Sequence, residues 1–277
     1  MPLPDFLGIG AQRSGSTWLH ELLASHPQIY VPRRRKEVHY FDWYYDRGIR
    51  WYGRFFGSAA ARIRVRGEVT PDYLYHPDAP ARISATLPAC KLIVMLRRPE
   101  DRAISHYRLL VRDDALSAGF WDAARSMPEI LDRGHYSRYL RRYLDFFGRD
   151  RLLVLTFERS MSSPDAAKRL LASFLGVDEG LFPPASGRDE HNASFVPRAR
   201  HAYAAAIKVS RFLHRIDVDW PVRLLRAVGV GRLFGSAADV PPLSPEEKAR
   251  LRGLYEGEEE ELRSLLRLPE GVWSDVR

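Results

Sequence analysis

Hydrophobic residues follow two alternating patterns along the chain, which predict strands and helices in turn. Runs rich in Leu, Ile and Val, bounded by polar or Gly/Pro-containing sequence, are typical of buried strands and occur at residues 6–10, 63–69, 91–96 and 151–157. Amphipathic segments of helical period occur at residues 16–24, 99–111, 138–147, 164–175 and 245–266. This alternation predicts an α/β fold of three layers, with a central parallel sheet flanked by helices.

Length and composition indicate one globular domain. The chain has 277 residues, of which 45% are hydrophobic, enough apolar side chains for a sizeable core. We expect a single domain whose core spans about residues 5–180. A loop is expected at residues 181–197, where Pro183 and Pro184 interrupt the pattern, and a helical extension at residues 198–277. Long loops in compact domains often bind ligands.

Cysteine content and hydropathy indicate in which cellular environment we expect the protein. Cys90 is the only cysteine, which excludes an intramolecular disulfide and a zinc site with several thiolates, and its place before an apolar run predicts a small core residue. No apolar run approaches the roughly 18 residues of a membrane span, and the first ten residues lack a secretory signal pattern. We therefore expect no transmembrane segment and a cytoplasmic location. Nothing in the sequence indicates the oligomeric state.

The charge balance predicts an anionic ligand. The net charge is +8, and 38 of the 43 basic residues are arginine, a side chain that binds phosphate or sulfate through two parallel hydrogen bonds. Charge alone does not separate nucleic acid, a membrane surface, a nucleotide and an acidic substrate, and an arginine-rich genome would also explain the excess. The sequence has neither a helix-turn-helix signature nor an RNA-binding aromatic motif, which argues against nucleic acid as a partner.

A glycine-rich turn follows the first predicted strand. It reads Gly10-Ala11-Gln12-Arg13-Ser14-Gly15-Ser16-Thr17, and a helical pattern begins directly after it at Trp18. The backbone N–H groups of such a turn and the dipole of the helix can converge on a phosphate. The spacing is that of the P-loop, G-x-x-x-x-G-K-[ST], but Ser16 replaces the lysine and Arg13 can supply the positive charge. The turn predicts a P-loop-type fold with a phosphate site, unless it only joins strand to helix.

Basic side chains also follow the strand predicted at residues 91–96. Arg97 and Arg98 come directly after it, and Ser105 lies eight residues beyond Arg97, within the predicted helix. A strand-end arginine and a serine at this spacing can meet around one anion. A nucleotide triphosphatase would instead place an aspartate at such a strand end to hold Mg²⁺. The pattern predicts a second phosphate site, and the alternative is a solvated basic face of the helix.

The segment Lys36-Glu37-Val38-His39-Tyr40-Phe41-Asp42 carries candidate acid–base chemistry. If residues 37–41 are extended, Glu37 and His39 share one face, because side chains alternate along a strand. A carboxylate beside an imidazole can act as a general base with its orienting partner. Ordinary loop residues would look the same, so both interpretations stay open here. The aromatic residues from Trp43 to Phe56 belong either to the core or to a surface that stacks on a sugar or a planar acceptor.

The combination of these features resembles the sulfotransferases that use 3'-phosphoadenosine 5'-phosphosulfate, in particular the heparan sulfate type and its bacterial relatives. The resemblance runs from residue 6 to about residue 177 and rests on the order and spacing of several motifs. They are the lysine-less loop, the segment at residues 36–51, the motif Gly67-Glu68-Val69-Thr70-Pro71-Asp72-Tyr73, and residues 96–107 with the strand-end arginine and its serine. Two further segments follow in the same order, residues 136–147 and residues 152–157 with the helix after them.

The resemblance implies an enzyme that transfers a sulfuryl group from this donor to a hydroxyl, less often an amine, of a small-molecule, glycolipid or carbohydrate acceptor by in-line displacement. The implied contacts of the 5'-phosphosulfate come from the loop: Arg13, Ser14, Gly15, Ser16, Thr17 and Trp18. The implied contacts of the 3'-phosphate are Arg97 and Ser105, with Arg188 and Arg198 as further donor ligands. No metal is implied, because arginines and amides take the place of Mg²⁺.

The resemblance also implies the catalytic groups. Glu37 is the expected base, with His39 and Asp42 beside it, and Arg13 takes the role of the family's lysine. The chain departs from the heparan type at Val69, where those enzymes commonly have a lysine, and this departure argues against a polysaccharide acceptor. The single cysteine also excludes the disulfide of the heparan enzymes.

Two other classes of function remain as alternatives. A P-loop kinase or nucleotide hydrolase would use the same glycine-rich loop, but Ser16 and the missing strand-end aspartate oppose it. A nucleic-acid-binding protein would explain the net charge of +8, although no binding motif supports it. Turnover of ATP with Mg²⁺ would favour the first, and binding to arbitrary DNA with a steep salt dependence would favour the second.

Overall fold

The computed structural model of the protein describes residues 2–33, 35–57, 61–112, 119–184, 196–197, 235–236, 242–268 and 273. The chain forms two compact units. The first unit contains Met1–Arg102, Arg133–Asp189 and Leu254–Arg277, and the second contains Ala103–Asp132 and Glu190–Gly253. The expected division into a single domain with a loop at residues 181–197 and a helical extension stays a prediction, because most of that region lies outside the described residues.

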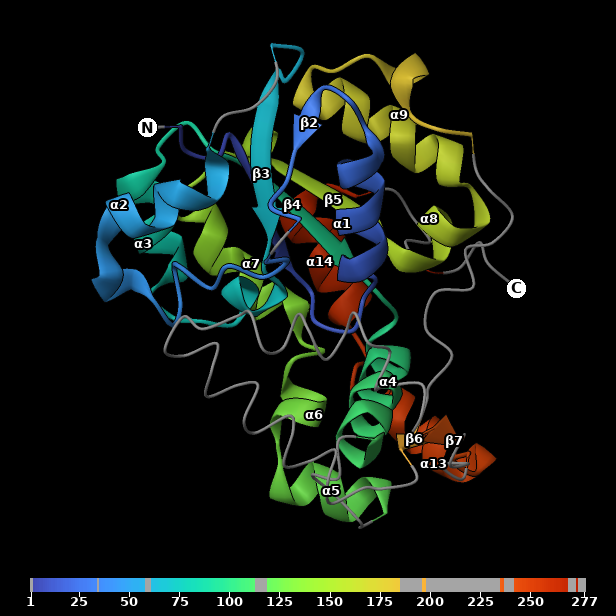
Figure 1. Ribbon diagram of the computed structural model, residues 1–277. Coiled ribbons are helices and arrows are strands. Elements are labelled where there is room, and N and C mark those ends of the chain that lie inside the picture. The colour runs from blue at the N-terminus through green and yellow to red at the C-terminus, as the bar shows by residue number, and fades with distance from the viewer. Residues whose placement is uncertain are drawn as a thin grey trace. The chain divides into compact units, whose positions relative to one another are not determined.

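The first unit is built on a parallel sheet (Figure 1). Its strands are β1 (Phe6–Gly10), β2 (Ile29–Tyr30), β3 (Val65–Val69), β4 (Lys91–Leu96) and β5 (Leu152–Thr156), in the order β2-β3-β1-β4-β5. Every neighbouring pair in this sheet is parallel, which confirms the predicted sheet. The sequence does not predict β2, because this strand has only two residues and no repeating pattern. The parallel arrangement brings the carboxyl ends of β1, β3 and β4 to one edge, where α/β folds bind ligands.

Hydrophobic side chains alternate along the strands and build a core on each face of the sheet. Within β4, Val94 packs into one cluster and Ile93 into the other. The helices that contribute to the Val94 cluster include α7 (Tyr136–Leu144) and α14 (Glu258–Leu266), and those that contribute to the Ile93 cluster include α1 (Ser16–Ser25) and α9 (Pro164–Leu175). The result is the predicted three-layer α/β architecture of the P-loop type, with the sheet between two helical layers.

The other elements are mostly short. The first unit also contains α2 (Gly48–Gly53), α3 (Ala79–Thr86), α8 (Phe157–Ser162) and the 3-10 turns η1 (Tyr45–Arg47), η2 (Arg54–Phe56), η3 (Pro71–Leu74), η4 (Arg149–Arg151) and η5 (Glu179–Leu181). The second unit contains α5 (Phe120–Ser126), α6 (Glu129–Asp132), α13 (Pro245–Gly253) and an antiparallel pair of β6 (Val196–Pro197) and β7 (Gly235–Ser236). Helix α4 (Pro99–Arg112) begins in the first unit and continues into the second.

One helix prediction is wrong in an informative way. The amphipathic pattern at residues 245–266 predicts one helix, but the structure has α13 and α14 with a break between them. The break coincides with Gly257, whose φ of 87° lies in the left-handed region that an α-helix does not use and that glycine adopts without strain. Tyr255, within the break, is 7% exposed, so it packs inward instead of continuing a helix surface.

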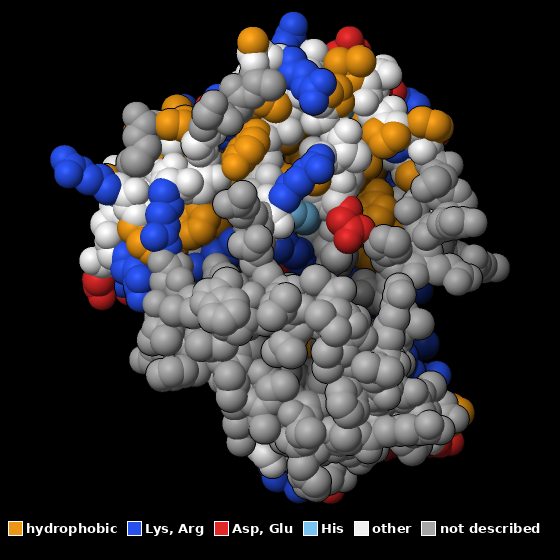
Figure 2. Space-filling model, viewed as in Figure 1, with side chains coloured by type: hydrophobic (Ala, Val, Ile, Leu, Met, Phe, Trp, Pro, Cys, Tyr) orange, Lys and Arg blue, Asp and Glu red, His pale blue; other side chains and the backbone are white. Residues whose placement is uncertain are grey.

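The structure bears on two expectations, the place of Cys90 in the core and the lack of a membrane-spanning helix. Cys90 is 2% exposed and belongs to the Val94 cluster, which confirms it as a small core residue. Among the helices in the described part of the chain, none has the length and hydrophobicity needed to cross a membrane. Among the described residues on the face shown, Figure 2 shows Lys and Arg side chains at several places between hydrophobic ones.

Candidate active site

The glycine-rich turn leaves β1 and delivers the chain to the start of α1. Arg13 and Gly15 both have left-handed backbones, with φ of 70° and 94°. A side chain at Gly15 would also collide with Met95 and Phe157, since an added Cβ would lie 2.8 Å from an atom of each. Gly15 stands at the N-cap position of α1 and has no side chain that could accept a hydrogen bond from the first N–H groups of the helix. The turn thus has the geometry of an anion site at a helix N-terminus.

The other loop candidates differ in how their groups are used. The Ser14 side chain is fully buried, and its N–H donates to the carbonyl of Ala11 at 3.2 Å, a bond internal to the turn. Trp18 is 9% exposed and packs in the Ile93 cluster. The hydroxyl of Thr17, by contrast, lies outside the core and accepts a hydrogen bond from Lys36 at 2.7 Å. Of the side chains of Ser14, Thr17 and Trp18, that of Thr17 faces the rest of the candidate site.

Arg97 lies beside the same turn, at the end of β4. One of its terminal nitrogens donates to the carbonyl oxygen of Arg13 at 3.5 Å, and its guanidinium carbon lies 4.7 Å from the ring centre of Phe157. Its Nε is buried and has no hydrogen-bond partner in the described part of the chain. A buried donor without an acceptor is costly, so this nitrogen fits an anionic ligand that the protein itself does not supply. Arg97 therefore joins the turn as a second cationic group.

Three predicted donor ligands stay predictions. Ser105 lies on α4 in the part that belongs to the second unit, whereas Arg97 belongs to the first. Arg188 and Arg198 lie outside the described residues.

Val69, where the heparan type has a lysine, is 1% exposed and packs in the Ile93 cluster, against Gly8.

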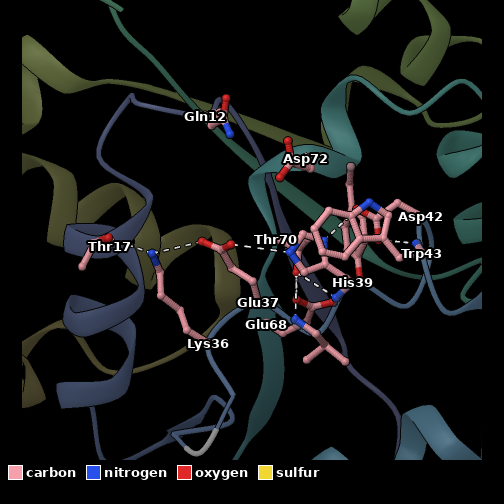
Figure 3. Close-up of polar contacts among 12 residues, drawn as sticks. Gln12, Thr17, Lys36, Glu37, His39, Asp42, Trp43, Glu68, Thr70 and Asp72 are labelled. Atoms are coloured by element: carbon pink, nitrogen blue, oxygen red, sulfur yellow. Dashed lines mark hydrogen bonds and ion pairs between the residues drawn. The ribbon is translucent and has the colours of Figure 1, made fainter. Parts of the chain in front are cut away.

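A chain of polar contacts links the turn to the predicted base (Figure 3). Lys36 Nζ lies 2.7 Å from Thr17 Oγ1 and 3.3 Å from Glu37 Oε1. Glu37 Oε2 lies 3.6 Å from His39 Nε2, and His39 Nδ1 lies 2.8 Å from Asp42 Oδ2. The predicted catalytic residues Glu37, His39 and Asp42 therefore form one continuous array, and Lys36 connects that array to the loop.

The charges in this array stabilise one another. Burial lowers the pKa of His39, but hydrogen bonds and charges from Asp42 and Glu37 outweigh it and raise the pKa to about 10, so the imidazole is a cation at neutral pH. Burial likewise raises the pKa of Glu37, but the hydrogen bond from His39 and the charge of Lys36 outweigh it and lower the pKa to about 2. Glu37 is thus a carboxylate held between two cations.

The backbone at His39 corrects one sequence prediction. Residues 37–41 are not an extended strand, because His39 has a φ of 58°, in the left-handed region. Its carbonyl oxygen accepts hydrogen bonds from the N–H groups of Trp43 and Tyr44, at 3.1 and 3.0 Å, which closes a turn. Histidine tolerates this conformation better than a β-branched residue. The two side chains meet, as predicted, but through a turn and not through strand alternation.

The aromatic stretch divides into core and surface. Tyr44, Tyr52 and Phe56 are 5% exposed or less. Trp43 is 62% exposed, and its ring stacks on His39 with the ring centres 3.8 Å apart and the planes 2° from parallel. One face of the indole therefore covers the imidazolium, and most of the remaining surface is open.

Sequence reasoning missed two contributors to the site. Lys36 stands in the motif at residues 36–42 but is not among the predicted site residues. A lysine next to a candidate base is nevertheless a signal, because the two charges can pair. Arg133 lies far along the chain, and its Nη1 donates to Gln12 Oε1 at 2.6 Å and to Asp72 Oδ1 at 2.9 Å. These bonds tie the turn to the segment after β3. No local pattern marks Arg133, because its role depends on the tertiary fold.

Comparisons with known proteins agree with this geometry. The sulfotransferase domain family matches residues 3–191. The chain is 34% identical over 187 residues to the mouse heparan sulfate glucosamine 3-O-sulfotransferase 3B1, covering 63% of this chain and 46% of that protein. It is 30% identical over 202 residues to the bovine bifunctional heparan sulfate N-deacetylase/N-sulfotransferase 2, covering 63% and 22%. The matched region thus spans less than half the length of these curated relatives.

Solved structures share the fold. A sulfotransferase from Alicyclobacillus acidocaldarius superimposes with a TM-score of 0.72 and 23% identity, over 99% of both chains. The mouse sulfotransferase SULT7A1, complexed with PAP, superimposes with a TM-score of 0.51 and 15% identity, over 94% of this chain and 84% of that one. At these identities the likeness concerns the fold. The family match, which covers more than half of the residues, shows that the chain belongs to the sulfotransferase family.

Proposed function

We propose that this protein transfers the sulfuryl group of 3'-phosphoadenosine 5'-phosphosulfate to a hydroxyl group of a small-molecule, glycolipid or carbohydrate acceptor. The observation that carries the proposal is the position of Lys36, whose ammonium contacts both Thr17 in the phosphate loop and the carboxylate of Glu37. A phosphosulfate on the loop and an acceptor hydroxyl at Glu37 would therefore be one side chain apart. In-line transfer depends on holding the two partners at such close range.

The described residues fit this donor in two places. The uncapped start of α1 offers N–H groups to the 5'-phosphosulfate, alongside Arg13 and Thr17. The buried Nε of Arg97 lacks a partner among the described residues and suits the 3'-phosphate, with Ser105 as the proposed second ligand. The bound donor supplies an activated sulfur–oxygen bond, and these residues would hold it and neutralise the charge that develops on its phosphate.

We assign the acceptor's proton to Glu37. Its pKa of about 2 keeps the carboxylate ionised throughout the physiological range, so it can take the hydroxyl proton while the acceptor oxygen bonds to sulfur and the sulfur–phosphate oxygen bond breaks. The cations beside it hold the carboxylate in place but also weaken it as a base. Lys36 lies within reach of the loop as well as of Glu37, so an anion on the loop would draw charge away from the carboxylate and raise its basicity.

The charge of the site favours a hydroxyl over an amine. A free amine is an ammonium at neutral pH, and the cationic side chains of Lys36 and His39 would repel it. A neutral hydroxyl meets no such penalty. The exposed indole of Trp43, stacked on His39, offers a flat surface for the sugar or aromatic ring that carries the hydroxyl.

The donor assignment is tested by thermal unfolding with adenosine 3',5'-bisphosphate, adenosine 5'-phosphate, or ATP with Mg²⁺, at equal concentrations. At a hundredfold excess over Kd a ligand stabilises the folded state by about 2.7 kcal/mol, which raises Tm by about 5 to 10 °C for a chain of this size. We expect this shift with the bisphosphate only. The shift should fall in Arg97→Ala but persist in the control Arg125→Ala, whose guanidinium pairs with Asp122 on the surface. Stabilisation by ATP with Mg²⁺ alone would instead favour a kinase.

A further inference from the structure

A second glutamate contacts the turn at residues 37–44 through hydroxyl groups, and we call this turn, which carries Glu37 and His39, the acceptor-side turn. Glu68, near the end of β3, is fully buried. Three hydroxyl groups donate hydrogen bonds to it: Thr70 Oγ1 to Oε2 at 2.5 Å, Tyr73 OH to Oε1 at 2.7 Å and Tyr52 OH to Oε1 at 3.2 Å. Among the described residues, its hydrogen-bond donors are thus hydroxyl groups and not ammonium or guanidinium groups.

Two of these hydroxyls also hold the backbone of the acceptor-side turn. Thr70 Oγ1 accepts from the N–H of Val38 at 3.1 Å and from the N–H of His39 at 3.4 Å. The hydroxyl of Tyr73 accepts from the N–H of Tyr40 at 2.8 Å. Three consecutive amides are therefore fixed through hydroxyls that end on one carboxylate. These amides belong to the turn that carries Glu37 and places His39 in its left-handed conformation.

The hydrogens in this network can be assigned. A hydroxyl has one proton to give. Thr70 and Tyr73 each already accept from backbone N–H groups, so each gives its proton to Glu68, one to Oε2 and the other to Oε1. Glu68 must then accept at both oxygens, which only the ionised carboxylate does without losing a bond. A glutamine, with one oxygen and one NH₂, cannot replace it here.

We propose that Glu68 is a positioning residue for sulfuryl transfer, which as a buried carboxylate orients Thr70 and Tyr73 and through them fixes the turn that presents Glu37 and His39. The inference rests on the proposed function for its catalytic consequence. Its structural part, that an ionised Glu68 orders residues 38–40, stands on the contacts alone.

The network also gives the turn a dependence on pH. Burial raises the pKa of Glu68 to about 7, while the hydroxyls of Thr70, Tyr73 and Tyr52 and the charge of His39 act to lower it. The thiol of Cys90 also lies within electrostatic range. As the pH falls through about 7, protonation takes away an acceptor that Thr70 or Tyr73 needs. Glu37 and His39 do not change charge in this range, because their pKa values are about 2 and about 10.

Hydrogen exchange measured by mass spectrometry tests the structural part on the intact chain. In Glu68→Gln we expect amides in a peptide spanning residues 36–44 to exchange about tenfold faster or more, whereas a peptide from β4 keeps its protection. Thr70→Val should act similarly, and Thr70→Ser, which keeps the hydroxyl, should restore protection. The control is Tyr52→Phe, which removes a donor to Glu68 that the turn does not use. Unchanged exchange in Glu68→Gln, or equal loss of protection in both peptides, would overturn the proposal.

Kinetics test the catalytic part. With labelled donor and octyl glucoside or phenol as hydroxyl probes, we expect kcat of Glu68→Gln to fall by about tenfold to a hundredfold while KM for the donor stays within twofold. The acidic limb of the wild-type kcat profile, near pH 7, should disappear in the variant. A normal kcat together with faster exchange would reject the catalytic consequence only. Failure of the wild type to bind adenosine 3',5'-bisphosphate or to turn over would count against the proposed function and leave the exchange result to judge the network.

Discussion

Glu37 and Glu68 are the same side chain in opposite environments, on two segments that meet at one edge of the sheet. Glu37 lies in the turn after β2, is 33% exposed, and is held between Lys36 and His39. Glu68 is fully buried and is held by hydroxyl groups. Cations lower the pKa of the first to about 2, and burial raises the pKa of the second to about 7. The same residue type is thus suited to chemistry where cations hold it as an accessible carboxylate, and to positioning where it is buried among hydroxyl groups.

The comparison predicts that removing the charge of Glu37 has the largest effect. Glu37→Gln keeps the size of the side chain but cannot take a proton, so kcat should fall by about 10²- to 10⁴-fold. The thermal shift with adenosine 3',5'-bisphosphate should stay close to that of the wild type, because the donor contacts are elsewhere. A matched control is Glu260→Gln on the exposed side of α14, which should change neither quantity. A kcat of Glu37→Gln within threefold of the wild type would remove it from the role of base.

The two glutamates should also respond to pH with opposite signs. Glu68 binds its proton more tightly in the folded state than in the unfolded chain, where its pKa is 4.5, so its ionisation costs stability as pH rises from 4.5 to about 7. A shift of this size corresponds to about 3 kcal/mol. Glu37 has a lowered pKa, so its contribution is present above pH 4.5 and is lost as pH falls toward 2.

Denaturant unfolding at several pH values measures this difference. Relative to the wild type, Glu68→Gln should gain stability between pH 5 and pH 8, whatever hydrogen bonds it loses at the outset. Glu37→Gln should lose stability relative to the wild type above pH 5, and the difference should vanish near pH 2. A parallel pH response of the two variants would show that their environments are not opposite.

Lys36 is a cation that contacts Glu37 and has no counterpart among the hydroxyl groups that hold Glu68. Lys36→Met keeps most of the apolar stem but removes the ammonium that contacts Thr17 and Glu37. We expect kcat to fall by about tenfold to 150-fold and the affinity for the bisphosphate to drop, since one charge-assisted contact is worth about 1.5 to 3 kcal/mol. Exchange of the amides of residues 38–40 should not change. Faster exchange there would mean that Lys36 supports the turn and not the chemistry.

The sequence predicts the main strands and helices and the residues around Glu37, but not the role of Glu68. The strand at residues 6–10, the one at residues 91–96 and the helix at residues 164–175 were predicted with their observed bounds, because a buried parallel sheet imposes long apolar runs and helices impose a 3.6-residue period. Glu37, His39 and Asp42 were predicted as a group, because they lie within six residues of one another. Groups of functional residues that are close in the sequence can therefore be predicted from the sequence.

The remainder depended on contacts that the tertiary fold creates. The motif at residues 67–73 contains Glu68 but indicates no role for it. Its partners Thr70 and Tyr73 are local, but the amides that they hold belong to another segment. Arg133 reaches Gln12 across more than a hundred residues of sequence. The sequence does not divide the aromatic stretch into core and surface. Trp43 and Tyr44 are both aromatic, and only the tertiary fold determines that Tyr44 is buried and Trp43 exposed.

Trp43 offers the smallest and most specific test of the comparison. Its indole stacks on the imidazole of His39 and packs against Tyr44, neither of which is among the hydroxyl groups that contact Glu68 through hydrogen bonds to its carboxylate. Trp43→Ala should raise KM for an acceptor that carries a ring by about three- to tenfold, because one aromatic contact contributes about 0.5 to 1.5 kcal/mol beyond its buried area. The value of kcat should change little, since binding lost equally from the ground state and the transition state affects KM alone.

Two controls make this outcome specific. Trp43→Phe keeps a flat ring and should recover most of the affinity, and an acceptor without a ring, such as a short linear alcohol, should show no change in KM. Exchange of the amides of residues 38–40 should also stay as in the wild type, because the hydroxyls of Thr70 and Tyr73 still hold them. If Trp43→Ala instead lowered kcat and loosened those amides, the indole would be supporting the turn. The division between groups that act in the reaction, such as Glu37, and groups that position the turn, such as Glu68, would then fail at Trp43.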